Sequence, residues 1–190
     1  MLLTAVSMAQ LPVLPYRHQV RLGVGVLFVG SGDMIGSNYR NEYEYLVQKR
    51  ISVAASLNFG QAAREIQGIG TKTYRVVKSV TTADINLLFA PIDTKTFKIK
   101  AGAGLSFKKQ LDNDPRSVGF SRTNYGGDPN FEMVDYNYQG NIRTFSVGWV
   151  VPVSVELYAG RWAYQLRPSL HSFSDGEINT ALVFGVGYRF

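Results

Sequence analysis

The chain has 190 residues, of which 45% are hydrophobic, and this length suits one domain. No run of about twenty apolar residues occurs, so a transmembrane helix is excluded. The lack of cysteine excludes disulfides and thiolate metal sites. Two histidines are too few to favour a metal site or to suggest a cofactor. The formal net charge of +6 comes from lysines and arginines spread along the chain, so nucleic acid is not an expected partner, whereas anionic lipid head groups fit.

The chain begins with a short apolar stretch, residues 2–6, followed by the small residues Ser7 and Ala9. This pattern is typical of the end of a secretion signal, although a charged start is missing. We therefore predict that residues 1–9 are a signal-peptide remnant and that residues 10–190 form the folded domain. A loose terminal arm is the alternative interpretation.

Eight later segments alternate between apolar and polar residues, which is the pattern of β-strands with two different faces. In the third segment, for example, Val53 and Leu57 fall on one face and Ser56 on the other. The predicted strands are Gln19–Val29, Tyr39–Val47, Ile51–Gln61, Val80–Ala90, Phe97–Lys108, Ile142–Leu157, Trp162–Ser172 and Ile178–Phe190.

Two of the predicted strands contain a proline, Pro152 in the sixth and Pro168 in the seventh. Proline has no N–H to donate to a neighbouring strand, and a closed sheet has no free edge to accommodate this loss. We therefore expect a bulge, a strand end or another local irregularity near each proline.

The connections between the predicted strands alternate in length. The short ones are at 48–50, 91–95 and 158–161, and the long ones are at 30–38, 62–79 and 110–141. We interpret 62–79 as a loop with strand extensions. This alternation is typical of membrane barrels with short periplasmic turns, longer external loops and both termini on the periplasmic side. The predicted fold is all-β: a closed, antiparallel, eight-stranded, up-and-down transmembrane β-barrel in an outer membrane.

Aromatic residues gather near both ends of the predicted strands, with aliphatic residues between them, as the two interfaces of a bilayer favour. The predicted external girdle contains Phe28, Phe59, Phe107 and Phe145. The predicted periplasmic girdle contains Tyr45, Phe89, Phe97, Trp162, Tyr164, Tyr188 and Phe190.

The alternating strands, the signal-like start and the final residues 185–190, Gly-Val-Gly-Tyr-Arg-Phe, resemble the small outer-membrane β-barrels of Gram-negative bacteria, the OmpA transmembrane-domain and OmpX class. The resemblance covers nearly the whole chain as architecture, without a diagnostic internal motif. It implies that Tyr188 and Phe190 are the signal read by the barrel-assembly machinery. It also implies that outer-membrane lipid and lipopolysaccharide surround the barrel.

The other face of the strands carries charged residues and glycines. Because the lumen of an eight-stranded barrel is just filled by side chains, we expect these charges to neutralise one another and to plug the barrel, and a conducting pore is the alternative. The predicted lumen charges are Arg21, Arg40, Glu42, Glu44, Asp84, Lys98, Lys100, Glu156, Arg167 and Arg189.

The favoured function is a non-enzymatic membrane protein with a structural or surface-interaction role, and the loop at 110–141 could bind an external ligand. An enzymatic alternative uses His171, Ser174 and Glu177, and resembles the outer-membrane lipid A deacylases, although Phe173 stands where their motif has serine. A third possibility is a soluble lipocalin-like barrel whose apolar side chains face inward around a small ligand. Acidic residues near Asp112 do not have the spacing of a calcium loop, so no metal is predicted.

Overall fold

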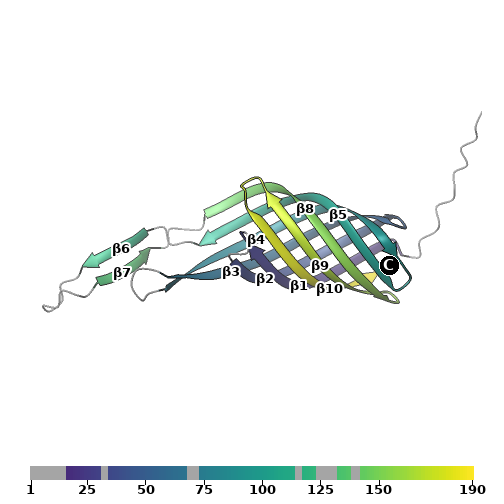
Figure 1. The fold of residues 1–190 in the computed structure, drawn as a ribbon, viewed down its shortest axis with the longest axis horizontal. Helices are drawn as coiled ribbons and strands as arrows, with labels where there is room; N and C mark the ends of the chain where they lie inside the picture. Colours follow the sequence, from purple (N-terminus) through teal and green to yellow (C-terminus); the bar gives the residue numbers. More distant parts are fainter. Residues whose placement is uncertain (1–15, 31–33, 68–72, 114–116, 123–131, 138–141) are drawn as a thin grey trace, which may run out of the picture.

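A computed structural model of the chain describes residues 16–30, 34–67, 73–113, 117–122, 132–137 and 142–190 (Figure 1). The expected signal segment, residues 1–9, lies outside these ranges. Two strands, β6 (Ser117–Arg122) and β7 (Glu132–Asn137), pair only with each other. Eight strands form a closed barrel: β1 (His18–Val29), β2 (Met34–Gln48), β3 (Ile51–Gln67), β4 (Thr73–Asp93), β5 (Phe97–Asn113), β8 (Ile142–Ala159), β9 (Trp162–Phe173) and β10 (Ile178–Arg189).

The order around the barrel is β1-β10-β9-β8-β5-β4-β3-β2, and the pairing between neighbours is antiparallel throughout. The predicted fold class, a closed antiparallel barrel of eight up-and-down strands, is therefore confirmed. Closure is made by β1 and β10, where His18 and Phe190 exchange two backbone hydrogen bonds of 3.0 and 2.9 Å. Across the described ranges, we find no helix that is long and apolar enough to cross a membrane.

The two ends of the barrel differ. At the end that we call the terminal end, His18 lies beside Phe190, and short turns at 49–50, 94–96 and 160–161 join the strands. The opposite end, the loop end, carries the connections at 30–33, 68–72, 114–141 and 174–177. Four adjacent strands, β3, β4, β5 and β8, have 17 to 21 residues, whereas β1, β9 and β10 have 12. One wall of the barrel therefore extends further than the other at the loop end (Figure 1).

These lengths correct the predicted connections. The sequence predicted a loop at 30–38, but β2 begins at Met34. At 62–79 it predicted a loop with strand extensions, and β3 and β4 do continue as a paired extension to Gln67 and from Thr73, which leaves a shorter connection than expected. The segment at 110–141 contains the β6–β7 pair, which the sequence did not predict. These extensions have backbone partners that a pattern of apolar residues does not reveal, since pairing satisfies N–H and C=O groups whatever the side chains are.

The two prolines interrupt the pairing without shifting it. No pairing is present between Val151–Pro152 and the facing Gly102–Ala103, yet the register of β5 with β8 is the same on both sides of the gap. A second gap lies where β8 faces Pro168, again with an unchanged register. The expected irregularity is therefore a gap at each proline and not a bulge. Register shifts occur elsewhere, between Leu46 and Gln48 and between Phe89 and Ile92.

The faces of the strands are as the alternation predicted. Large apolar side chains point outward and are exposed, for example Leu22 and Leu105, while polar and charged side chains point inward and are buried. Glycines on the inner face serve two purposes. A Cβ at Gly187 would lie 2.6 Å from Cγ of Arg21, so this glycine makes room for the arginine, whereas a Cβ at Gly104 would lie 2.1 Å from the carbonyl oxygen of Ile85, so that glycine permits close approach of two strands.

Candidate functional site: the barrel lumen

The terminal half of the lumen contains a group of ion pairs that we call the charged layer. Arg21 on β1 is its centre and contacts three carboxylates, Glu42, Glu44 and Glu156, the last at 2.8 Å. Lys100 on β5 lies 2.7 Å from Glu44 and 2.9 Å from Glu156. These contacts join strands β1, β2, β5 and β8 across the barrel. The side chains of Glu42, Glu44 and Glu156 are all buried.

Two further arginines complete this layer from the side of Glu42. Arg40 and Arg167 approach Oε2 of Glu42 at 2.6 and 2.5 Å. Arg167 comes from β9, so Glu42 connects strands on nearly opposite sides of the ring. The charged layer thus contains seven of the ten predicted lumen charges: Arg21, Arg40, Glu42, Glu44, Lys100, Glu156 and Arg167.

The other three predicted charges lie apart from the charged layer. Lys98 pairs with Asp93 at 3.3 Å, near the terminal turn after β4. Arg189 makes no ion pair with the described residues and instead lies over the rings of Tyr158 and Tyr16, at 4.0 and 5.0 Å. The sequence placed these residues on the correct face but did not indicate their separate partners.

Asp84 is the third predicted lumen charge that lies outside the charged layer, and its hydrogen-bond partners are mainly neutral. Its carboxylate accepts hydrogen bonds from Ser106 at 2.6 Å, Asn58 at 2.7 Å and Ser56 at 3.2 Å. His171 lies 3.4 Å away on the other side. Ser56 also accepts a hydrogen bond from Arg40, so it connects Asp84 to the charged layer through one hydroxyl.

The enzymatic alternative required His171, Ser174 and Glu177 to act together. His171 is buried in the lumen and faces Asp84, whereas Ser174 is exposed in the turn after β9. Glu177 contacts Lys78 and Lys108. Among the described residues, no hydrogen bond links any two of these three side chains, whereas a nucleophile and its base are expected within hydrogen-bond reach.

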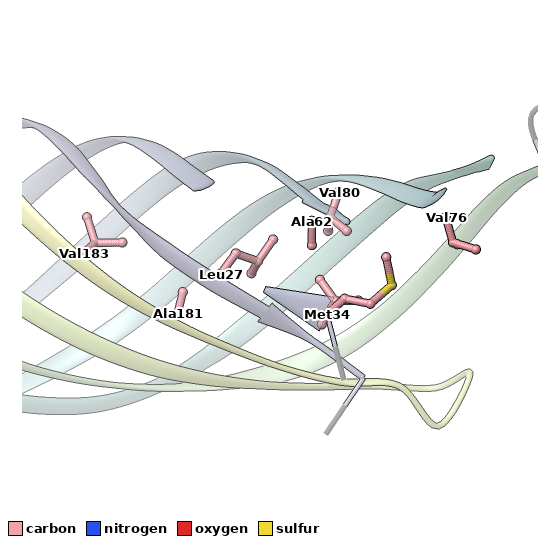
Figure 2. Packing of buried hydrophobic residues seen from close by; sticks show 8 residues of the cluster. Leu27, Met34, Ala62, Val76, Val80, Ala181 and Val183 are labelled. Carbon is pink, nitrogen blue, oxygen red and sulfur yellow. The ribbon is translucent and has the colours of Figure 1, made fainter. Parts of the chain in front are cut away.

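The loop half of the lumen contains an apolar layer (Figure 2). Leu27 and Val29 on β1 point inward there, and Val183 on β10 is 1% exposed. Apolar residues were expected on the outer face, so this layer was not predicted from the sequence. The available signal was the run Val26-Leu27-Phe28-Val29, in which apolar residues occupy both faces. The complete layer is Leu27, Val29, Met34, Ala62, Val76, Val80, Ala181 and Val183.

A cavity of about 20 Å³ lies at the boundary between the polar and apolar parts. Polar residues such as Asn58 and His171 and apolar residues such as Leu27 and Val80 both line it. This volume is sufficient for about one water molecule.

Another group of charges, which we call the loop-end cluster, lies at the loop end and consists of Lys78, Lys108, Asp175 and Glu177. Lys78 lies 2.9 Å from Glu177, and Lys108 contacts Glu177 as well as Asp175, the latter at 2.8 Å. Burial raises the pKa of Glu177, but the hydrogen bonds and charges of Lys108 and Lys78 outweigh it and lower the pKa from its usual value. The pKa of Asp175 is lowered for the same reason, against burial, by Lys108, the backbone of Glu177 and Ser146.

The predicted girdle residues all lie in strands of the barrel or at their ends, but their exposure differs. Phe28, Tyr45 and Phe97 are half-buried, and the other members are exposed. At the terminal end, the ring of Phe190 stacks on His18 with 5.6 Å between the centroids, and Tyr188 packs edge-on against Trp162 at 5.4 Å. The two predicted assembly residues are thus packed side chains of the closing strand that remain partly accessible from outside.

The predicted ligand segment at 110–141 is described only in part. Asp112 accepts a hydrogen bond of 2.9 Å from Gln110, and most of the other side chains of this segment lie outside the described residues. The hypothesis that this segment binds an external ligand therefore stays a prediction.

No protein-family model and no curated protein matches this sequence. Solved structures do match it over nearly its whole length. Ail, the attachment invasion locus protein of Yersinia pestis, is 9% identical, with a TM-score of 0.58 over 93% of this chain and 100% of that chain. The fold is that of the small outer-membrane barrels.

Two other matches give the same result. Neisserial surface protein A is 13% identical, with a TM-score of 0.58 over 91% of this chain and 97% of that chain. The outer membrane protein OprG from Pseudomonas aeruginosa is 10% identical, with a TM-score of 0.58 over 92% of this chain and 96% of that chain. At these identities the shared property is the fold, and it agrees with the resemblance that the sequence indicated.

Proposed function

We propose that this chain is a non-enzymatic outer-membrane β-barrel protein with a structural or surface-interaction role. The observation that carries this proposal is the distribution of side chains across the barrel wall. The outer face exposes large apolar residues on all eight strands, while the charged residues are buried inside. A soluble barrel of the lipocalin type has the opposite arrangement, so this distribution does not favour that alternative. An apolar exterior over a closed sheet suits hydrocarbon, because closure leaves no edge strand with a row of unpaired backbone groups.

The fold neighbours support an outer membrane as the location, and lipid and lipopolysaccharide as the surroundings of the outer face. In this proposal the terminal end faces the periplasm, because its turns are short, and the loop end faces outward. Tyr188 and Phe190 would carry the signal for the barrel-assembly machinery, and residues 1–9 would be the remnant of a secretion signal. Sequencing the N-terminus of the mature protein would test the last point.

A first experiment tests the membrane assignment directly. We expect the full chain to refold in detergent micelles and to show a folded form whose gel migration changes on heating. We also expect Leu57→Arg, in the exposed apolar belt, to reduce the free energy of unfolding in lipid vesicles by about 2–4 kcal/mol, since it places a cation in hydrocarbon. Thr96→Arg in a terminal turn, where the side chain is exposed, is the matched control and should leave the stability unchanged. A chain that stays monomeric and soluble without detergent would overturn the proposal.

We further propose that the lumen does not conduct ions. Buried ion pairs in the charged layer and aliphatic side chains in the apolar layer would block the passage in series. In planar bilayers, the intact protein is therefore expected to show no channel activity. Leu27→Gly is the variant in which conductance is easier to detect, because it removes a side chain from the apolar layer while the charged layer is retained. Steady conductance from the unmodified protein would show that the layers are open.

A surface-interaction role would use the loop end. The long wall and the β6–β7 pair place the 110–141 segment beyond the rest of the barrel (Figure 1). Ail, which shares the fold, has been solved in complex with the heparin analogue sucrose octasulfate. A variant in which residues 114–141 are replaced by a short turn should still fold, because these residues are outside the barrel sheet, and should lose any binding to host-type glycans or cells. Unchanged binding would assign the interaction to another surface.

A further inference from the structure

The terminal end of the lumen contains a pocket that the proposed function does not use. Its volume is about 470 Å³, within the usual range for small-molecule sites. Its wall includes buried residues of β1 and β5, together with residues of the turns after β2 and β4. Asp93 is the one carboxylate among the described side chains that line it. The cationic side chains that line it are Arg17, Lys49, Lys95, Lys98 and Arg189.

Arg189 is held in place in this pocket before any ligand arrives. Its guanidinium lies over the ring of Tyr158 at 4.0 Å and over that of Tyr16 at 5.0 Å, and Nη2 donates to the carbonyl oxygen of Gly160. Tyr158 is itself fixed by a hydrogen bond to Glu156 of the charged layer. Nε of Arg189 is buried and has no hydrogen-bond partner among the described residues. A positioned guanidinium with a free N–H is suited to bind an oxyanion.

The buried part of the pocket contributes two further donors. Lys98 is 6% exposed, and its ammonium has Asp93 at 3.3 Å and the carbonyl oxygen of Lys49 at 3.5 Å, so its contacts are long. Gln19 is 3% exposed, and its Nε2 has no hydrogen-bond partner among the described residues. A buried amide donor that lacks a partner is unfavourable, and an acceptor from a ligand would remove this cost.

We propose that this pocket binds a phosphate-bearing ligand. The excess of cations over the single carboxylate favours an anionic ligand, and phosphate provides both negative charge and several acceptor oxygens. Arg189 and Gln19 supply directional donors, and Lys98 and Lys49 supply point charges. The ligand is either a soluble phosphate compound or the head group of a phospholipid at the adjacent interface, since both present the same oxygens.

The test is a calorimetric titration of the full chain, refolded in zwitterionic micelles, with inorganic pyrophosphate. A parallel arm measures the binding of phosphatidylglycerol, against phosphatidylcholine, in mixed micelles. Saturable pyrophosphate binding supports the soluble source. Saturable binding of phosphatidylglycerol alone, with the same dependence on pocket residues, supports the head group. No saturable binding in either arm overturns the proposal.

Three variants and one control assign the binding to this pocket. We expect Gln19→Leu and Lys98→Gln each to raise Kd by about tenfold, the loss of one charge-assisted hydrogen bond. Gln19→Leu should retain full stability, because the donor that it removes has no partner. Lys49→Gln should raise Kd by about threefold, whereas Arg50→Gln, an exposed neighbour that does not line the pocket, should not change it.

Equal weakening by Lys49→Gln and Arg50→Gln would indicate general charge attraction and would overturn the site. Heat-dependent gel migration reports on barrel formation separately, so failure of the fold and failure of this site are distinguishable.

Discussion

The charged layer and the apolar layer fill the same lumen by different means. In the terminal half, four cations and three glutamates interlock, and each depends on a particular partner. In the loop half, eight small or medium-sized apolar residues pack without directional contacts. The charged layer therefore specifies which strands face each other, whereas the apolar layer mainly excludes water from the space.

The difference predicts how each layer responds to substitution. Removing one charge leaves other charges buried without a partner, which costs more than the contact itself was worth. Removing part of an apolar side chain leaves a cavity, and its cost depends on how far the neighbours relax. The charged layer should therefore be the more sensitive of the two.

The largest effect is expected for Glu42→Gln in the charged layer. Arg40 and Arg167 both lose their carboxylate partner, and the cost should be about 3–5 kcal/mol in the free energy of unfolding. Denaturant titration of the refolded protein in micelles or vesicles measures it. Glu65→Gln, an exposed glutamate on β3, is the control and should stay within about 0.5 kcal/mol of the parent. If Glu42→Gln behaves like Glu65→Gln, water enters the charged layer and the comparison between the layers fails.

A smaller effect is expected for Leu27→Ala in the apolar layer, at about 2–3 kcal/mol, because three buried carbon atoms are lost beside an existing cavity. Leu22→Ala on the same strand is the control. Leu22 is 55% exposed on the outer face, where acyl chains can fill the space, so it should cost less than Leu27→Ala. The reverse order would mean that the apolar layer is loosely packed.

Asp84→Asn, at the boundary between the layers, should cost about 1–2 kcal/mol, since its partners Ser56, Ser106 and Asn58 are neutral and can rearrange. Ser37→Ala on the exposed face of β2 is the matched polar control and should have little effect. A loss for Asp84→Asn as large as that for Glu42→Gln would show that Asp84 neutralises a buried cation and belongs to the charged layer.

Much of this fold was predictable from the sequence because strand periodicity is a local property. A residue such as Leu22 differs from Arg21 in polarity, and this alone indicates the face on which each lies. The β6–β7 pair was not predictable in the same way, and the extensions of β3 and β4 were predicted without their bounds. Both show no clear alternation, and their stability depends on backbone partners.

The site was predictable only as a set of residues. Arg167 and Glu42 could be assigned to the lumen, but they lie 125 positions apart, and their contact follows from the registers of several strand pairs around the barrel. Arg189 could be assigned to the same face, yet its aromatic partners, Tyr158 near the end of β8 and Tyr16 before β1, could not be read from the alternation. The apolar layer left a signal at Val183, which lies between Leu182 and Phe184 in a run that is apolar on both faces.

The smallest expected effect concerns the loop-end cluster, which differs from both layers because it lies at the rim. Lys108 and Lys78 lower the pKa of Glu177 and of Asp175 from their usual values of 4.5 and 3.8. Since the folded pKa values are the lower ones, the cluster stabilises the fold fully above these usual values. This contribution is lost as the pH falls through the folded values.

Unfolding of the parent should therefore become easier below about pH 4, and part of this acid sensitivity should disappear in Glu177→Gln. The comparison is made between the two proteins at each pH, because the buried glutamates of the charged layer are retained in both and their titration cancels. At pH 7 Glu177→Gln should be slightly less stable than the parent, since the buried Lys108 keeps Asp175 as its partner, and the two curves should converge at low pH. Raising the salt concentration should reduce the difference at pH 7, since Lys78 is partly exposed. Parallel curves at every pH would mean that the turn after β9 is not tied to β4 and β5 by charge, and that the rim of the short wall is held by backbone pairing alone.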